Sequence, residues 1–149
     1  MKHGEIISEL EKIRAMESDG VLRAECVVEV ASNPGHPLHG HFEWDDSAAA
    51  QQWRLQQARQ MINVLVQFVP HVEANHRVYV SLYRDRAEEG GGYRVISEVL
   101  SNKQLRNEML EEALAELKDF EQKYRSLQEL ADVFAAARKA RRETLIPVG

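Results

Sequence analysis

The stretch from Asn102 to Arg142, NKQLRNEMLEEALAELKDFEQKYRSLQELADVFAAARKARR, contains neither glycine nor proline. Apolar and small side chains recur through it in steps of three and four, which places them on one face of an α-helix. This seam consists of Leu110, Ala113, Leu117, Phe120, Tyr124, Leu127, Ala131 and Phe134. The pattern predicts one coiled-coil-like helix of ~40 residues and ~60 Å. The sequence does not decide whether that helix is straight or broken near Ser126.

A helix of this length exceeds what a chain of 149 residues needs to cover its own core. Another helix must therefore share the seam. One alternative is a second copy of the chain, so that the protein is a homo-oligomer, and this is our prediction. The other is a hairpin with helices of the same chain at residues 4–17 and 46–66. Leu114, Leu130 and Val133 widen the apolar face, which suits a bundle of several helices.

The N-terminal part of the chain is also predicted to be helical. Residues 4–17 and 46–66 carry apolar stripes at helical spacing. Residues 21–31 fit either a helix or a strand, and the Asn33-Pro34-Gly35 turn that follows favours the helix. Together these segments predict a helical module over residues 1–66.

The central part of the chain predicts a β-hairpin followed by a loop. Two runs of alternating side chains flank Ala74-Asn75-His76, which we expect to form the turn, and Pro70 would confine the first run to a sheet edge. RAEEGGGYR, residues 86–94, predicts a mobile linker. The predicted fold class is mainly α with a small β-hairpin (α+β): a helical module at 1–66, the hairpin and Gly-rich loop at 67–92, and a long oligomerisation helix with a basic end at 93–149.

Residues 33–46, NPGHPLHGHFEWDD, combine three histidines with three carboxylates. We expect a structured turn, anchored on the core by Leu38, Phe42 and Trp44 and capping the next helix through Asp45 and Asp46. His36, His39 and His41 are weak candidates for metal ligands, because their spacing matches no common zinc site. We therefore predict no metal and no cofactor.

Composition favours a non-enzymatic cytoplasmic protein. No apolar run approaches the ~20 residues of a membrane span, and the charged N-terminus does not fit a signal peptide. Cys26 is the single cysteine and lies in an apolar run, so it predicts neither a disulfide nor a nucleophile. No hydrolase motif is present. Only a deep pocket lined by His39, Glu43 and Asp46 would favour an enzymatic function.

Nucleic-acid binding is the more specific alternative. The net charge of −5 argues against extensive wrapping, but residues 21–66 have the outline of a helix-turn-helix with an overlong connection. The predicted DNA contacts are Gln52, Arg54, Gln56, Arg59, Arg138, Lys139, Arg141 and Arg142. A solvated helix face explains the first four equally well. Favourable interaction with a helix dipole explains the basic stretch equally well.

The segment PLHGHFEWDD (37–46), Arg54, Ala58-Arg59 and the GGY of Gly91-Gly92-Tyr93 make the sequence resemble a group of small bacteriophage and prophage proteins, mostly of unassigned function. The resemblance covers roughly residues 25–135. It implies a phage-related origin, and no functional residue can be carried over from it.

Two functional hypotheses follow. The first is a phage-encoded, non-enzymatic, oligomeric DNA-associated protein, acting as a regulator or as a small-terminase-like packaging factor. On this hypothesis, replacing Arg54 and Arg59 together by alanine abolishes DNA retention without lowering the melting temperature. The second is a protein-binding, virion structural or host-interaction factor that does not bind DNA.

Overall fold

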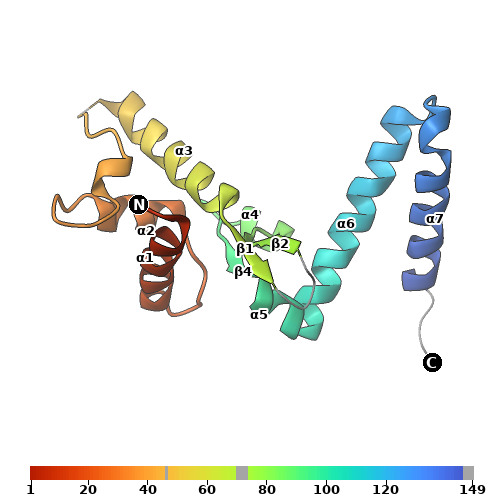
Figure 1. Cartoon of the computed structure of the whole chain (residues 1–149), viewed down its shortest axis with the longest axis horizontal. Helices are drawn as coiled ribbons and strands as arrows, with labels where there is room; N and C mark the ends of the chain where they lie inside the picture. The colour runs from red at the N-terminus through yellow and green to blue at the C-terminus, as the bar shows by residue number, and fades with distance from the viewer. Residues whose placement is uncertain (46, 70–73, 146–149) are drawn as a thin grey trace. The chain divides into compact units, whose positions relative to one another are not determined.

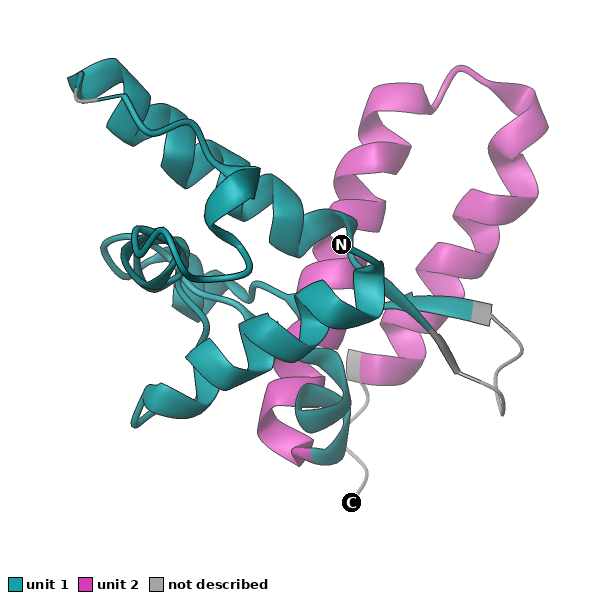
Figure 2. Cartoon of the chain, turned by 60° about the vertical axis from the view of Figure 1, so that its left-hand side comes forward, with its two compact units in different colours: residues 1–101 teal, residues 102–149 magenta. Residues whose placement is uncertain are grey.

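A computed structural model describes residues 1–45, 47–69 and 74–145 (Figure 1). It is mainly helical with small antiparallel sheets, which confirms the predicted fold class. The chain divides into two compact units, residues 1–101 and 102–149 (Figure 2). This division differs from the boundaries predicted after residues 66 and 92, because the strands and the Gly-rich loop pack within the first unit.

Unit 1 alternates helices with short strands. Its elements are α1 (His3–Met16), α2 (Ala24–Ala31), the 3-10 helix η1 (His39–His41), α3 (Ala48–Val64), β1 (Val66–Val69), β2 (Ala74–Arg77), β3 (Tyr79–Val80), α4 (Tyr83–Arg86), β4 (Arg94–Val95) and α5 (Ile96–Ser101). Unit 2 contains α6 (Lys103–Tyr124), the 3-10 helix η3 (Gln128–Leu130) and α7 (Ala131–Leu145).

The core of unit 1 forms where α1, α2 and α3 meet. Leu10 of α1, Val27 of α2 and Ala58 of α3 are fully buried. The ambiguous segment 21–31 contains a helix, α2, with Val27 and Ala31 on its buried side. Because these side chains recur at helical spacing, the three stripes can pack together and exclude water.

The strands differ from the predicted hairpin. β1 pairs antiparallel with β2, with Val66 opposite Arg77, so the predicted turn at Ala74-Asn75-His76 is wrong and those residues belong to a strand. Residues 70–73, which connect β1 to β2 in the sequence and include Pro70, fall outside the described structure. β3 leaves that ladder and pairs with β4 instead, with Tyr79 opposite Val95.

The Gly-rich loop is attached to the core, which corrects the prediction of a mobile linker. Leu22 and Tyr93 exchange two backbone hydrogen bonds of 2.8 Å each. A Cβ atom on Gly92 would lie 2.4 Å from Cγ1 of Val21, so any side chain at this position would force Val21 to shift. Asp85, 4% exposed, forms a side-on hydrogen-bonded pair with Arg94 and holds the other side of the loop.

Unit 2 is a helical hairpin in which α6 and α7 lie side by side in opposite directions (Figure 1). The prediction of one continuous helix from Asn102 to Arg142 is therefore wrong. The helix ends at Tyr124, Leu127 adopts an extended backbone, and η3 leads into α7. No glycine or proline causes this break. Instead, reversal lets Phe134 contact the ring of Phe120, with centroids 6.1 Å apart.

A pH-dependent contact closes the connection between α1 and α2. Arg23 Nη2 donates to Asp19 Oδ2 at 2.6 Å, and the Val21 amide donates to Asp19 Oδ1 at 3.0 Å. The hydrogen bond from Arg23, reinforced by the Val21 amide, lowers the pKa of Asp19 from 3.8 to about 2. The ionised carboxylate is therefore the form that the fold favours.

We expect Asp19→Asn to lower the free energy of unfolding at pH 7 by about 0.5 kcal/mol, because the pair is half-exposed and screened. A lowered folded-state pKa stabilises the fold above the unfolded value and loses that contribution as pH falls from about 4 to about 2. Urea titrations of both proteins should show the full difference at pH 7 and only a small part of it at pH 2, where about half of the folded-state carboxylate is protonated. An undiminished difference at pH 2 would contradict the assignment.

Candidate functional site

Arg54, predicted to contact DNA, is instead a structural residue. Only 9% of it is exposed. Its Nη1 donates to the backbone oxygens of Glu43 and Asp45 at 2.9 and 2.8 Å, and its Nη2 donates to Gln51 Oε1 at 2.8 Å. The guanidinium lies 5.2 Å from the centroid of the Trp44 ring. These contacts use the side chain to fix the turn on α3, so it is not available to phosphates.

The turn that Arg54 holds is built from aromatic and backbone contacts. Trp44 Nε1 donates to the His39 carbonyl at 2.9 Å, and the two rings stack with centroids 4.8 Å apart. Leu38 is fully buried and Phe42 is 8% exposed, so both fasten the turn to the core. Asp45 Oδ1 accepts from the Ser47 amide at 2.9 Å, and Ser47 caps α3. Asp46 lies outside the described residues.

The three histidines of this turn serve separate contacts. His39 Nδ1 donates to the Ala31 carbonyl at 2.8 Å. His36 Nδ1 accepts from the Leu38 amide, and its Nε2 lies 3.6 Å from Glu9 Oε2. His41 is exposed. Within the described ranges, no three His, Cys, Asp or Glu side chains gather as a metal site would require.

The other predicted DNA contacts on α3 do not form a basic surface with Arg54. Gln52 and Gln56 are exposed, as is neighbouring Trp53. Arg59 Nη2 lies 3.5 Å from Glu25 Oε1, so a carboxylate already accompanies its charge. The predicted helix-turn-helix face therefore retains two neutral amides and one paired arginine.

The thiol of Cys26 does not resemble a catalytic nucleophile. It lies 3.3 Å from Glu17 Oε1. Burial, together with this carboxylate, raises the pKa of the thiol from 9.0 to about 11. The group therefore stays protonated at neutral pH, whereas thiol chemistry needs the thiolate.

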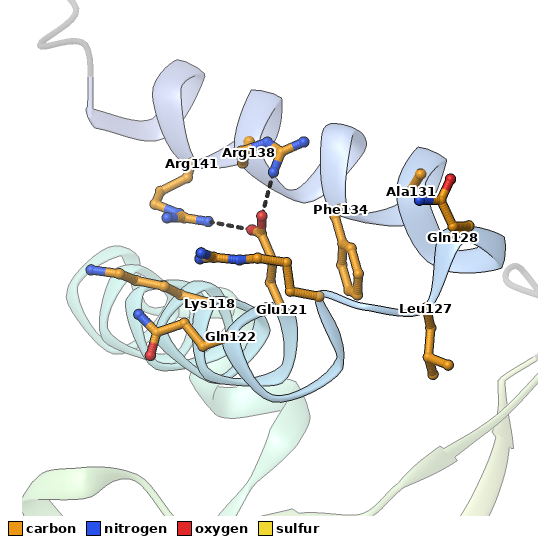
Figure 3. Close-up of a pocket in the computed structure, with 10 residues that line it drawn as sticks. Lys118, Glu121, Gln122, Leu127, Gln128, Ala131, Phe134, Arg138 and Arg141 are labelled. Atoms are coloured by element: carbon orange, nitrogen blue, oxygen red, sulfur yellow. Dashed lines mark hydrogen bonds and ion pairs between the residues drawn. The ribbon is translucent and has the colours of Figure 1, made fainter.

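The predicted cations of the C-terminal segment fall into two groups on α7. Arg138 and Arg141 reach towards α6, where Arg138 pairs with Glu121 and Arg141 Nη2 lies 3.8 Å from Glu121 Oε2 (Figure 3). Lys139 and Arg142 are exposed, and Lys139 Nζ lies 3.9 Å from Glu143 Oε1. Glu121 itself is 8% exposed, so it acts as a buried counter-ion within the hairpin.

A pocket of about 490 Å³ lies between α6 and α7 around this pair (Figure 3). Four cationic side chains line it, and α6 and the bend after it contribute two that sequence reasoning missed, Lys118 and Arg125. Leu127, Ala131 and Phe134 line it as well and give it an apolar part. The sequence could not indicate that Lys118 and Arg125 belong to this pocket, because a straight helix would place them far from Arg138 and Arg141.

Most of the predicted seam is exposed on the hairpin. Because α6 is continuous, Leu110, Ala113, Leu117, Phe120 and Tyr124 share one face of it, which we call the apolar stripe. Leu117 is 39% and Phe120 43% exposed. The other three seam residues lie beyond the break: Leu127 is exposed in the connection, Ala131 begins α7, and Phe134 is buried.

The hairpin has little core of its own. Among its described side chains, four are buried: Leu114, Glu121, Phe134 and Ala137. One of the four is a carboxylate, which stabilises only through its arginine partners. A pair of helices with so small an apolar core usually depends on further packing, because most helical stability comes from tertiary contacts.

Comparison with known proteins finds no matching family model, no similar curated protein and no similar solved structure. The resemblance to phage proteins therefore stays a prediction. Among the described helices, none combines the length and the apolar character needed to cross a bilayer.

Proposed function

We propose that this protein is a non-enzymatic binding protein that functions as a homodimer, with the apolar stripe of α6 forming the contact between two copies. The observation that carries this proposal is the exposure of Leu117 and Phe120 on a hairpin with few buried side chains. Large apolar side chains gathered on one helix face are typical of an interaction surface.

Charge favours a second copy as the occupant of this surface. Helix α6 carries four Lys or Arg and six Asp or Glu, a net charge of 4 − 6 = −2, whereas α7 carries four and two, a net charge of +2. In a two-fold pair each surface meets its own copy, so α6 of one hairpin can lie over α7 of the other. The opposite charges of the two helices then face each other in both halves.

The direct test is the mass of the protein in solution by size-exclusion chromatography with light scattering. We expect twice the protomer mass of 17.1 kDa at micromolar concentration. A monomer under these conditions would contradict the proposal. Moderate salt should weaken the dimer only in part, because it screens the charges of α6 and α7 but not the burial of the stripe.

A second candidate function is association with DNA, as the sequence suggested. It is favoured by the gathering of Lys118, Arg125, Arg138 and Arg141 around one pocket, with Arg142 exposed nearby. In unit 1, this candidate function loses its strongest predicted DNA contact, because Arg54 donates its hydrogen bonds to backbone oxygens. Regulation and packaging of phage DNA both remain compatible with this candidate, as does a role in the cytoplasm of a host cell.

A random-sequence duplex distinguishes the two candidates. If the protein associates with DNA, retention should be strong at low salt and fall steeply as salt rises, because phosphate contacts release counterions. A dimer that does not retain the duplex even at low salt would leave the protein-binding function and exclude the second candidate. The partner would then be sought among phage or host proteins.

A further inference from the structure

The guanidinium of Arg141 has an unused hydrogen-bonding edge. Its Nε and Nη2 atoms are shielded from solvent and have no hydrogen-bond partner among the described residues. The nearest anion, Glu121 Oε2, is 3.8 Å from Nη2, which is beyond hydrogen-bonding distance. Nε and Nη2 project their N–H groups in parallel, and this edge matches two oxygens of one phosphate or carboxylate.

The surroundings of this edge favour an anion. The pocket is lined by Lys118, Arg125, Arg138 and Arg141 against the single carboxylate Glu121, a net charge of 4 − 1 = +3. Within the described residues, no ion pair involves Lys118 or Arg125. Buried guanidinium N–H groups need acceptors, and an oxyanion in this pocket would supply the acceptors that the described protein groups do not.

We propose that the pocket between α6 and α7 is a binding site for a phosphate group, held by the Nε–Nη2 edge of Arg141 and neutralised by Lys118, Arg125 and Arg138. Figure 3 shows Arg138 and Arg141 of α7 converging on Glu121 of α6, with Lys118 on the neighbouring part of α6. Long rotatable side chains form much of the wall, so the pocket can open to admit a ligand. The volume of about 490 Å³ exceeds that of one phosphate.

Glu121 has a defined part in this site. It pairs with Arg138 and lies beside Arg141, so it occupies the arginines when no ligand is bound. A phosphate must compete with this carboxylate for the same guanidinium groups. Removing the charge of Glu121 should therefore strengthen phosphate binding, an effect that a purely structural role of Arg141 would not produce.

The test is calorimetric titration of the full chain with pyrophosphate at low ionic strength. We expect Arg141→Gln to weaken binding about tenfold or more, because the paired hydrogen bonds are lost. The matched control is Arg142→Gln. Arg142 is the next residue in the sequence, is exposed and does not line the pocket, so the substitution removes the same charge outside the site. It should weaken binding less than about threefold, through screened charge alone.

The outcomes separate two sources of the phosphate. Binding of pyrophosphate supports a site for small phosphate compounds. If a short oligothymidylate binds but pyrophosphate does not, and Arg141→Gln weakens that binding, the result supports a site for the backbone of a nucleic acid. No binding of either ligand, equal losses in the two arginine variants, or no gain in Glu121→Gln would each overturn the proposal.

Folding and self-association are followed separately. If Arg141→Gln loses its helical circular dichroism signal, the phosphate affinity of Glu121→Gln becomes the test, and we expect it to be higher than that of the parent protein. The inference does not rest on the proposed dimer, and the light-scattering mass of each variant reports on that independently. A dimer that binds neither ligand would overturn the phosphate site and leave the proposed function intact.

Discussion

Replacing Leu117 and Phe120 together by glutamine should convert the dimer into a folded monomer. Both side chains are about two-fifths exposed in the protomer, so dimer formation can bury that fraction. At about 1 kcal/mol for each partly exposed side chain, four of them across a two-fold interface contribute about 3–4 kcal/mol. The Kd of the dimer should therefore rise roughly a hundredfold or more, which light scattering across a dilution series would measure.

The matched control is Ala115→Gln. Ala115 is exposed on the same helix, two residues before Leu117 and therefore on the opposite side of α6. It adds the same amide without touching the apolar stripe, so the dimer should persist. Dissociation in both variants, or in neither, would show that the stripe does not form the contact between copies.

Arg54→Ala should lower the free energy of unfolding by about 2–4 kcal/mol. The substitution removes three hydrogen bonds from a charged donor, leaving the Glu43 and Asp45 carbonyls without it. It also removes the guanidinium from the face of Trp44. A loss of this size corresponds to a fall in melting temperature of roughly 10–20 °C for a unit of this length, which calorimetry would detect.

Arg59→Ala is the control for this prediction. Arg59 lies five residues further along α3, and its side chain is 42% exposed beside Glu25. Such surface pairs contribute little, so the variant should stay within about 0.5 kcal/mol of the parent protein. If Arg54→Ala melted like Arg59→Ala, the structural role assigned to Arg54 would be wrong.

The contacts of Arg54 also change one part of an expectation drawn from the sequence, the part that concerns stability. The joint replacement of Arg54 and Arg59 was expected to abolish DNA retention while the melting temperature stayed unchanged. The contacts of Arg54 predict a clear loss of stability instead. A loss of DNA binding in that double variant would therefore not identify a DNA surface, whereas Arg59→Ala alone is informative.

Local sequence patterns determined the helices of the N-terminal part of the chain. Apolar residues at helical spacing define α1, α3 and the buried side of α2, because a helix with one apolar face needs only its own sequence to specify that face. The anchoring of the 33–46 turn by Leu38 and Phe42 could also be predicted, because the prolines disfavour a regular α-helix there and large apolar side chains are usually buried.

Tertiary structure alone decided where α6 ends and which charges are used internally. The segment 102–142 lacks a helix breaker, so the reversal after Tyr124 depends on contacts between distant residues, such as the Phe120–Phe134 and Glu121–Arg138 pairs. Arg54 looked like a free cation because two of its three acceptors are backbone oxygens, which every residue has and no sequence pattern marks. A sequence records the spacing of side chains along one element, whereas pairing between elements depends on distances that only the folded chain fixes.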